Sequence, residues 1–477
     1  MNRRMGLLIL FLSDILTLYL AIFCAYYTRN ILYFIPPPLD IALPQFLSLW
    51  WIPSIFVTFL LYERVYTHRR PFWDEVKELI RASTISFIFI IAIVTFGKVQ
   101  YGTSGVSRLL LILLWLYTLI LFPVIRLAVK TILFRLNLWM ENVIVIGAGP
   151  MGIEAAKGLE NHYYIGYRVL GFFDDDPKMK KRHLRVGKKR IKVFGKIKHF
   201  RKFVNLLNIS TVIIAIPSLP QEQLAQLTNE IQRYVKTVLF LPDLKGISIL
   251  NTEIYHLFNE EFFLFKINNN LKFVLSRTTK KTFDLVVGIL MLPVLLPLIA
   301  VISLVIKLDS PGPVFYTQPR VGRNGRTFRI IKFRSMYRDA ADRLKNLLAN
   351  ENLRREWESS YKLKDDPRIT RVGKFLRKTS LDELPQIFNV LKGNMSLVGP
   401  RPVLQDEIDK YYKGYSEYYH LVRPGISGIW QVSGRSDTDY DLRVRLDTWY
   451  VLNWSVWLDT VILFKTVRVV LKREGAY

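Results

Sequence analysis

Two adjacent carboxylates, Asp382 and Glu383, stand in a segment that is otherwise rich in cations and small residues. Arg377 and Lys378 come just before the pair, and Arg401 follows it closely. Adjacent carboxylates repel each other, so they are best tolerated where a divalent cation or a basic substrate pocket offsets their charge. A pair of this kind is suited to phosphoryl transfer.

A purely structural interpretation of the same residues is open. Ser380 could be the N-cap of a helix, with Glu383 as the third helical residue of a capping box. The carboxylates would then be solvated and would carry no chemistry. Taken alone, the segment fits this structural interpretation as well, so the neighbouring sequence has to distinguish it from the catalytic one.

A run of cations without any acidic residue lies between positions 320 and 338. Its members are Arg320, Arg323, Arg326, Arg329, Lys332, Arg334 and Arg338. Guanidinium forks match phosphate oxygens and keep their charge in a desolvated site. We therefore expect Lys332 and Arg334, which lie in a strand-like stretch, to belong to the site. The outer members could instead form a basic surface that rests on anionic lipid.

Histidine is rare near these groups, because His420 is the only one after position 280. A Ser-His-Asp device or a histidine-rich zinc site is therefore not expected there. The carboxylates must then carry the chemistry. Asp382 or Glu383 could be a nucleophile that forms an acyl phosphate, or a base and Mg²⁺ ligand.

The composition favours a membrane protein with anionic partners. The chain has 67 Lys+Arg against 39 Asp+Glu, a net charge of +28, and 51% of its residues are hydrophobic. This combination fits a protein facing the negative cytoplasmic leaflet better than a nucleic-acid-binding factor. The only cysteine, Cys24, leaves no partner for an intramolecular disulfide and no thiolate metal cluster.

Four apolar segments occupy the first quarter of the chain, each near the length that crosses a ~30 Å hydrocarbon core. They are Leu7–Tyr27, Phe46–Tyr62, Ala82–Phe96 and Leu109–Leu127. The basic residues that flank them predict that both ends of this helix bundle face the cytoplasm. A cleaved signal peptide is the other interpretation of the first segment, which is long and lacks a clear small-residue cleavage site.

The next region has the order of strand, glycine turn and helix that is typical of dinucleotide-binding folds. The strand pattern 142–146 runs into the glycine-rich segment 147–152. A second strand, 167–173, ends in the acidic run 174–176, where a ribose-binding acid would sit, and a third covers 211–216. The spacing predicts a Rossmann-like α/β domain with a parallel sheet.

Whether this domain binds a nucleotide is a separate question. The basic insert Lys178–Lys198 is long, Pro150 intrudes into the turn, and the chain has no Tyr-x-x-x-Lys pair. These features favour a structural or regulatory domain over a nucleotide sensor. They favour it still more strongly over a redox catalyst such as a membrane-anchored sugar-nucleotide dehydratase.

The third region begins with the hydrophobic stretch Phe283–Ile306, which contains Pro293 and Pro297. Two prolines four residues apart favour a break in a helix. A helix that bends back at Pro297 would return both of its ends to the cytoplasmic face. The carboxylates would then meet nucleotide-activated substrates, whereas a complete crossing would leave them outside.

The segment from Lys280 to the C terminus resembles the catalytic domain of the monotopic phosphoglycosyl transferases, bacterial sugar transferases that start glycan assembly on a polyprenyl phosphate. The motifs that carry the resemblance are Thr282-Phe283-Asp284, Arg320-Val321-Gly322, Lys332-Phe333-Arg334-Ser335-Met336, Ser380-Leu381-Asp382-Glu383-Leu384-Pro385-Gln386, Gly399-Pro400-Arg401-Pro402, Arg423-Pro424-Gly425-Ile426-Ser427-Gly428 and Gln431-Val432-Ser433-Gly434-Arg435. The two preceding regions are similar to the long members of this family. Members often carry Ser-Pro at the helix break, where this chain has Leu296-Pro297.

The resemblance implies a ping-pong reaction. Asp382 would attack the sugar-proximal phosphate of a UDP-hexose, release UMP, and hold the phosphosugar until undecaprenyl phosphate collects it. Glu383 would accept a proton or position the substrate, and Mg²⁺ near Asp382 would offset the diphosphate charge. The implied substrate-binding residues, of which the last two rest on motif position, are Lys332, Arg334, Arg377, Arg401, Arg435 and Asp447.

We therefore expect three domains and a linker. A four-helix transmembrane bundle occupies 1–138, a Rossmann-like domain 139–250 and a linker 251–279. A mixed α/β phosphoglycosyl transferase domain with a re-entrant membrane helix occupies 280–477. The expected location is the bacterial inner membrane, with the catalytic domain on the cytoplasmic face.

The expected partners are a UDP-hexose, undecaprenyl phosphate, anionic lipids and a second copy of the chain, without nucleic acid. Galactose is the expected hexose because of the overall likeness, since no residue visibly reads the sugar. A UDP-glucose-specific transferase and a non-enzymatic scaffold for glycan assembly are the alternatives.

Overall fold

The computed structural model describes residues 2–35, 41–100, 107–179, 182–242, 252–256, 263–267, 270, 273–349, 351, 354, 366–433 and 440–472. The chain forms two compact units, Met1–Asp243 and Leu244–Tyr477. The predicted domain boundary at residue 250 lies outside the described residues. Each unit has its own buried core and is considered by itself.

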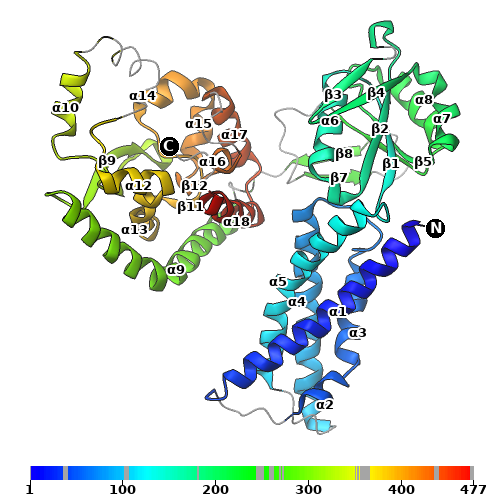
Figure 1. Ribbon diagram of the computed structural model, residues 1–477, viewed down its shortest axis with the longest axis horizontal. Coiled ribbons are helices and arrows are strands. Elements are labelled where there is room, and N and C mark those ends of the chain that lie inside the picture. Colours follow the sequence, from blue (N-terminus) through cyan, green and yellow to red (C-terminus); the bar gives the residue numbers. More distant parts are fainter. Residues whose placement is uncertain are drawn as a thin grey trace. The chain divides into compact units, whose positions relative to one another are not determined.

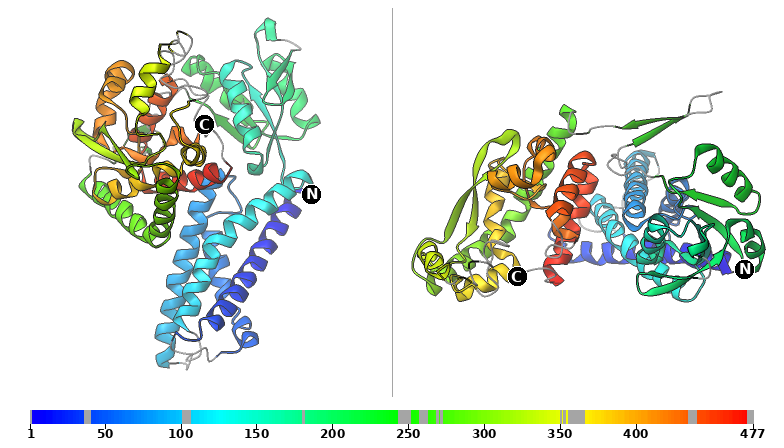
Figure 2. Two further views of the ribbon diagram at one scale, coloured as in Figure 1. Left: turned by 60° about the vertical axis from the view of Figure 1, so that its left-hand side comes forward. Right: turned by 90° about the horizontal axis from the view of Figure 1, so that it is seen from above.

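Long apolar helices open the first unit. Their bounds are α1 (Asn2–Ile31), α2 (Leu43–Leu47), α3 (Trp51–Tyr62), α4 (Phe72–Gln100) and α5 (Arg108–Arg135). Figure 2 shows α1, α4 and α5 running side by side, with α5 packed against both of the others. These elements supply four of the candidate membrane spans: Arg4–Ile31, Leu43–Tyr62, Phe72–Phe96 and Arg108–Arg135. Each of the four predicted apolar segments lies within one of them, as expected for a membrane protein.

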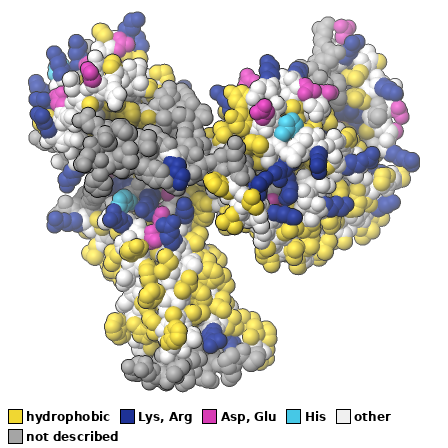
Figure 3. Space-filling view, turned by 180° about the vertical axis from the view of Figure 1, so that it is seen from behind, with side chains coloured by type: hydrophobic (Ala, Val, Ile, Leu, Met, Phe, Trp, Pro, Cys, Tyr) yellow, Lys and Arg dark blue, Asp and Glu magenta, His cyan; other side chains and the backbone are white. Residues whose placement is uncertain are grey.

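The bundle has an apolar outer surface, visible in Figure 3, and a charged cluster between its helices. Arg126 of α5 pairs with Asp14 of α1 at 2.6 Å and with Glu75 of α4 at 2.7 Å. Lys130 pairs with the same Glu75 at 2.6 Å, and the Tyr66 hydroxyl donates to Asp14 at 2.7 Å. Because two carboxylates face two cations, none of these four charges is left alone in apolar surroundings.

A six-stranded sheet completes the first unit (Figure 1). Its strands are β1 (Glu141–Ile146), β2 (Tyr167–Phe173), β3 (His183–Val186), β4 (Lys189–Gly195), β5 (Ile209–Ile214) and β6 (Thr237–Phe240). The order is β3-β4-β2-β1-β5-β6, and all neighbours are parallel except the β3–β4 hairpin. The connecting helices are α6 (Pro150–Asn161), α7 (Phe200–Leu206) and α8 (Gln221–Gln232). Alternate residues of β1 enter two separate apolar clusters, so both faces of the sheet are covered.

The glycine turn after β1 is closed by hydrogen bonds from within its own domain. Gly147 has a φ of +102°, and a Cβ there would lie 2.6 Å from the Ala215 carbonyl oxygen, so this position requires glycine. The Ala148 N–H donates to the Asp174 carboxylate at 2.6 Å. Pro150 opens α6, where the missing N–H costs nothing. The acid at the end of β2 therefore stabilises the turn.

The second unit consists of one long helix, which runs along one edge of the unit in Figure 1, and of shorter elements. The helices are α9 (Val274–Asp309), α10 (Ala340–Leu347), α12 (Arg371–Thr379), α13 (Ile387–Leu391), α14 (Gln405–Glu407), α15 (Ser416–Leu421), α16 (Ile429–Val432), α17 (Tyr440–Leu452) and α18 (Val456–Lys472). The strand pairs are β7 (Thr252–His256) with β8 (Phe263–Ile267), β9 (Phe315–Val321) with β10 (Thr327–Phe333), and β11 (Ser396–Val398) with β12 (Gly425–Ser427). The β7–β8 hairpin lies in the predicted linker.

Helix α9 is the fifth candidate membrane span. It begins at Val274, before the predicted domain start at 280, and contains both Pro293 and Pro297. The chain stays helical through the two prolines, and Figure 1 shows the helix bending along its course. The sequence-based prediction of a break at Pro297 thus corresponds to a bend without an interruption of the helix. Leu295 and Ile299, on either side of Pro297, pack into the core of the unit.

Candidate active site

The carboxylate pair lies on a tight turn between two helices. Helix α12 ends at Thr379, and the 3₁₀ turn Leu381–Gln386 leads into α13. Ser380 joins them with a φ of +58°, a left-handed conformation that is uncommon for a residue other than glycine. The Ser380 side chain makes no capping hydrogen bond to the turn that follows. The predicted capping box, which was the structural interpretation of this segment, is therefore not formed.

Glu383 is held by cations. The Lys332 ammonium lies 2.7 Å from its carboxylate, and the Arg401 guanidinium lies 3.7 Å from the same oxygen. Lys332 comes from β10 and Arg401 from the loop after β11, so three distant parts of the sequence meet here. The structure brings together three of the predicted site residues around this one carboxylate oxygen.

Asp382 lies in the same turn in a different electrostatic environment. Burial and the neighbouring Glu383 charge raise the pKa of Asp382 to about 6, while Lys332, Arg377 and Arg401 oppose this shift. Within the described part of the chain, no side chain or backbone N–H donates a hydrogen bond to this carboxylate. A half-buried carboxylate that is free of hydrogen bonds and surrounded by cations can act as a nucleophile toward an anionic phosphate.

Strand β10 is fixed against the turn by Asn389, a residue that the sequence analysis did not select. Its side-chain oxygen accepts from the Ile331 N–H at 2.9 Å, and its amide nitrogen donates to the Arg329 carbonyl at 2.8 Å. Asn389 is buried and belongs to α13, directly after the carboxylate turn. It therefore sets the distance between the strand that carries Lys332 and the turn. A neutral amide inside an apolar helix gives no charge signal in the sequence.

The loop that carries Arg401 is anchored from α9. The Asp284 carboxylate accepts from the Ser396 hydroxyl at 3.0 Å and from the Leu397 N–H at 3.2 Å. Lys280 donates to the Val398 carbonyl at 2.9 Å and pairs with Asp459 of α18 at 2.6 Å. Through Asp284, the Thr282-Phe283-Asp284 motif therefore holds β11, which leads into the loop that carries Arg401.

Arg377 and Arg334, both predicted to bind phosphate, lie in different settings. The Arg377 guanidinium donates to the Ser335 hydroxyl at 2.9 Å, and its charge acts on Asp382. Arg334 is 7% exposed and donates to the Ser310 and Pro311 carbonyls, each at 2.6 Å. Arg334 therefore ties β10 to the end of α9, and this placement gives no support to its predicted phosphate contact.

The remaining predicted residues are Asp447 and Arg435. Asp447 is 2% exposed on α17 and accepts a 2.7 Å hydrogen bond from the Tyr412 hydroxyl. Burial raises its pKa to about 7, although Arg443 and Tyr412 oppose the shift. The structure places Asp447 inside an aromatic core. Arg435 lies outside the described residues.

Comparisons with known proteins show which families and relatives the chain is similar to. The family model described as bacterial sugar transferase matches residues 275–473, and a model described as CoA-binding domain matches residues 63–242. The undecaprenyl-phosphate galactose phosphotransferase of Salmonella typhimurium is 41% identical over 87% of this chain and 84% of its own length. The UDP-galactose-lipid carrier transferase of Erwinia amylovora is 39% identical over 87% of this chain and 84% of its own length.

A relative named for another sugar is more distant. The undecaprenyl-phosphate glucose phosphotransferase of Komagataeibacter xylinus is 32% identical over 71% of this chain and 60% of its own length. Taken together, the matches show that the chain belongs to the bacterial sugar transferase family. It is a transferase enzyme, and the predicted family is confirmed.

Proposed function

We propose that this enzyme transfers a hexose-1-phosphate, with galactose as the hexose, from a UDP-sugar to undecaprenyl phosphate and releases UMP. Relatives that match more than four fifths of the chain are named for galactose transfer to a lipid carrier, which supports this substrate pair. The reaction would be the first membrane step in the synthesis of an O-antigen, capsule or exopolysaccharide. The single observation that carries the mechanism is the Asp382–Glu383 turn with its surrounding cations.

In the first half-reaction, a carboxylate oxygen of Asp382 attacks the sugar-proximal phosphorus of the UDP-hexose. A new O–P bond forms, and the bond from that phosphorus to the bridging oxygen breaks, so UMP leaves with the electron pair. The product is an acyl phosphate that carries the hexose. Lys332, Arg377 and Arg401 lower the energy of the charge that accumulates on the phosphate oxygens.

In the second half-reaction, an oxygen of undecaprenyl phosphate attacks the same phosphorus. The bond to Asp382 breaks, and the carboxylate is regenerated as hexose-diphosphate-undecaprenol forms. Glu383 would accept a proton from the incoming lipid phosphate or orient it, and the Lys332 ammonium 2.7 Å from its carboxylate supports the orienting role. Both displacements take place at phosphorus, so the bond between the anomeric carbon of the sugar and its oxygen is never broken.

The donor set also fits the predicted Mg²⁺. Among the described residues there is no cluster of three or more His, Cys, Asp or Glu side chains that would form an all-protein metal site. Mg²⁺ is commonly bound by one or two carboxylates together with substrate phosphates, and the Asp382 carboxylate accepts no hydrogen bond from the described residues. Asp382 would hold the ion, which when bound offsets the negative charge of the diphosphate.

The membrane arrangement completes the proposal. Helix α9 contains Pro293 and Pro297 and bends along its course, which supports a re-entrant helix with both ends at the cytoplasmic face of the bacterial inner membrane. The carboxylate turn would then lie near the headgroups, where a lipid phosphate meets a soluble nucleotide sugar. Anionic lipids would contact the basic segment 320–338, and a homodimer is part of the same proposal.

The test uses the full chain in detergent with UDP-galactose and a water-dispersible polyprenyl phosphate. Asp382→Asn should abolish UMP release and label transfer, whereas the matched variant Asp406→Asn should leave both unchanged. Asp406 is exposed on α14 and belongs to no part of the site. Full transfer by Asp382→Asn would refute the mechanism. Loss of transfer in a folded variant would refute a purely scaffolding role.

The choice of sugar needs a separate measurement. UDP-galactose, UDP-glucose and UDP-N-acetylgalactosamine are supplied in turn, and UMP release is followed. We expect the highest kcat/KM with UDP-galactose. A higher value with UDP-glucose would favour the alternative that the glucose-specific relative suggests.

A further inference from the structure

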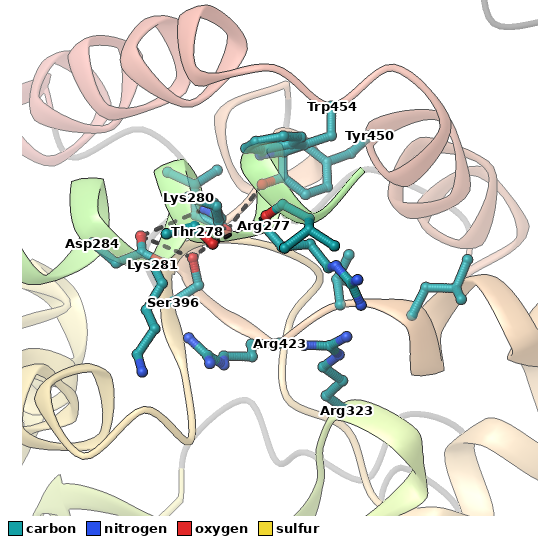
Figure 4. Close-up of a pocket in the computed structure, with 14 residues that line it drawn as sticks. Arg277, Thr278, Lys280, Lys281, Asp284, Arg323, Ser396, Arg423, Tyr450 and Trp454 are labelled. Carbon is teal, nitrogen blue, oxygen red and sulfur yellow. Dashed lines mark hydrogen bonds and ion pairs between the residues drawn. The ribbon is translucent and has the colours of Figure 1, made fainter. Parts of the chain in front are cut away.

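A cavity of about 420 Å³ opens in the second unit beside the first turns of α9 (Figure 4). Its walls come from α9, the β9–β10 turn, β11, the segment before β12, and the end of α17. The residues that line it include neither of the paired carboxylates and none of Lys332, Arg377 and Arg401. The cavity is therefore separate from the site to which we assigned phosphoryl transfer.

Four cations border this cavity without an ion-pair partner among the described residues. Arg277 and Lys281 project from α9 toward Arg323 and Arg423, as Figure 4 shows. No described carboxylate lies within ion-pair distance of any of the four, and the Arg323 Nε is buried without a hydrogen bond acceptor. The one carboxylate in the wall, Asp284, accepts hydrogen bonds from Ser396 and Leu397 through Oδ1, whereas its Oδ2 is buried without a hydrogen-bond partner among the described residues.

These cations also act on one another. Burial, together with the positive charges of Arg423 and Arg277, lowers the pKa of Arg323. Like charges that converge on one cavity destabilise each other unless an anion lies between them. Guanidinium groups from three separate elements can bind the oxygens of one phosphate from several sides.

The other polar residues of the lining, Thr278, Lys280, Ser396 and Tyr450, hydrogen-bond within the protein. The apolar part of the wall includes Val274, Leu421, Val422 and Trp454, with the last two buried. These side chains offer nothing to the hydroxyl groups of a free sugar phosphate, but they fit a glyceride or acyl group. The cavity also opens on the helix whose outward face is apolar, with Leu290 and Val294 more than 70% exposed. Such a surface is where lipid headgroups meet the protein.

We propose that this cavity binds the phosphate group of a membrane lipid through Arg277, Arg323 and Arg423, with Lys281 at its edge. The site goes beyond the proposed function, because such a lipid can bind whether or not Asp382 forms an adduct. A lipid held there fixes the first turns of α9 at the headgroup level. It thereby sets the depth of the whole catalytic unit.

The test measures ligand affinity with the full chain in a neutral detergent. Dioctanoyl phosphatidic acid carries both phosphate and acyl chains, dioctanoylglycerol carries only the chains, and glycerol 3-phosphate carries only the phosphate. We expect the phosphatidic acid to bind at least about tenfold more tightly than either partial ligand. Equal affinity for glycerol 3-phosphate would overturn the lipid assignment, and equal affinity for dioctanoylglycerol would overturn the phosphate assignment.

Variants locate the binding. Arg323→Gln combined with Arg423→Gln should weaken phosphatidic acid binding by about tenfold or more, because two charge-assisted contacts are lost. The control, Arg371→Gln with Arg445→Gln, removes the same charge from exposed positions of other helices and should bind like the unmodified chain. Unchanged affinity in the first variant, or an equal loss in both, would refute the site.

Two further measurements separate this inference from folding and from catalysis. The unfolding temperature without ligand checks that the double variant is folded. Should it fail to fold, the single variant Arg277→Gln at an exposed position must show a several-fold weaker affinity. Asp382→Asn should keep full phosphatidic acid binding even though it forms no adduct. Loss of lipid binding in Asp382→Asn would place the phosphate at the carboxylate pair and contradict a separate site.

Discussion

At the scale of single residues, the proposed chemistry depends on how Asp382 and Glu383 differ although they are neighbours. Lys332 and Arg401 hold Glu383, whereas Asp382 has no hydrogen bond from the described residues. Burial and the repulsion of Glu383 raise the pKa of Asp382 to about 6. The carboxylate is then mostly ionised at neutral pH. Its basicity, and hence its nucleophilicity toward phosphorus, is higher than that of an ordinary aspartate.

The pH dependence of the first half-reaction follows from this pKa. In the proposed mechanism Asp382 attacks only when ionised, so the rate of UMP release should be level above about pH 7 and fall about tenfold per pH unit well below 6. Lys332→Gln removes a cation that favours the ionised form, so it should move the acidic limb of the rate profile, where the rate falls, to higher pH. Glu383→Gln removes a repelling charge and should move it to lower pH. Single-turnover UMP release in a series of buffers measures each limb, and opposite or absent shifts would contradict the assignment.

Asp447 gives a prediction about stability. Burial raises its pKa in the folded chain to about 7, against about 3.9 in an unfolded chain. Between these values the folded state binds the extra proton. The contribution of Asp447 to the free energy of unfolding is therefore greatest below pH 4 and declines as pH rises to 7, by up to about 4 kcal/mol. Asp447→Asn should lack this part of the decline. Unfolding temperatures at pH 5 and pH 7.5 test it, and an identical pH dependence in both proteins would refute it.

At the scale of secondary-structure elements, the site depends on the contact between α13 and the edge strand β10. Asn389→Ala should leave the Ile331 N–H and the Arg329 carbonyl without partners, which costs about 2 to 4 kcal/mol. It should also lower kcat more than it raises KM, because Lys332 loses its fixed position. Asn394→Ala, at an exposed position in the turn after α13, is the control. Equal unfolding temperatures and rates for the two variants would contradict this role.

Some of these elements could be predicted from the sequence, and others could not. Adjacency in the sequence placed Asp382 and Glu383 together, and the strand-like stretch around Lys332 predicted a strand that carries a cation. The pattern showed the charge of Arg334 but not where its side chain points, which depends on the carbonyl of Ser310 at the end of α9. The uncharged Asn389 could not be found, since its role exists only once the strand and the helix are in contact.

The helix α9 shows the same limit. Its prolines predicted a break, because each removes a backbone donor. The structure keeps the helix continuous and bends it, as the apolar side chains around Pro297 pack against the unit's core. The prolines in the sequence indicated that α9 is irregular, whereas tertiary packing determined that it bends and does not break.

At the scale of the whole molecule, the bundle is stabilised by a buried ion cluster. Arg126→Met should leave Asp14 and part of the Glu75 charge unpaired between apolar helices, at a cost of about 3 to 5 kcal/mol. The unfolding temperature in detergent should fall accordingly. The control Arg108→Met, at the exposed start of α5, should have little effect. A loss no larger than that of the control would show that the cluster contributes little.

The central claim for the molecule is that Asp382 becomes covalently linked to the phosphosugar. The most direct measurement is intact-mass and peptide mass spectrometry of the full chain after incubation with UDP-galactose in the absence of a lipid acceptor. We predict a hexose-phosphate adduct on the peptide that contains Asp382, formed together with UMP and removed when undecaprenyl phosphate is added. Turnover in the complete reaction without any adduct at this position would contradict the mechanism.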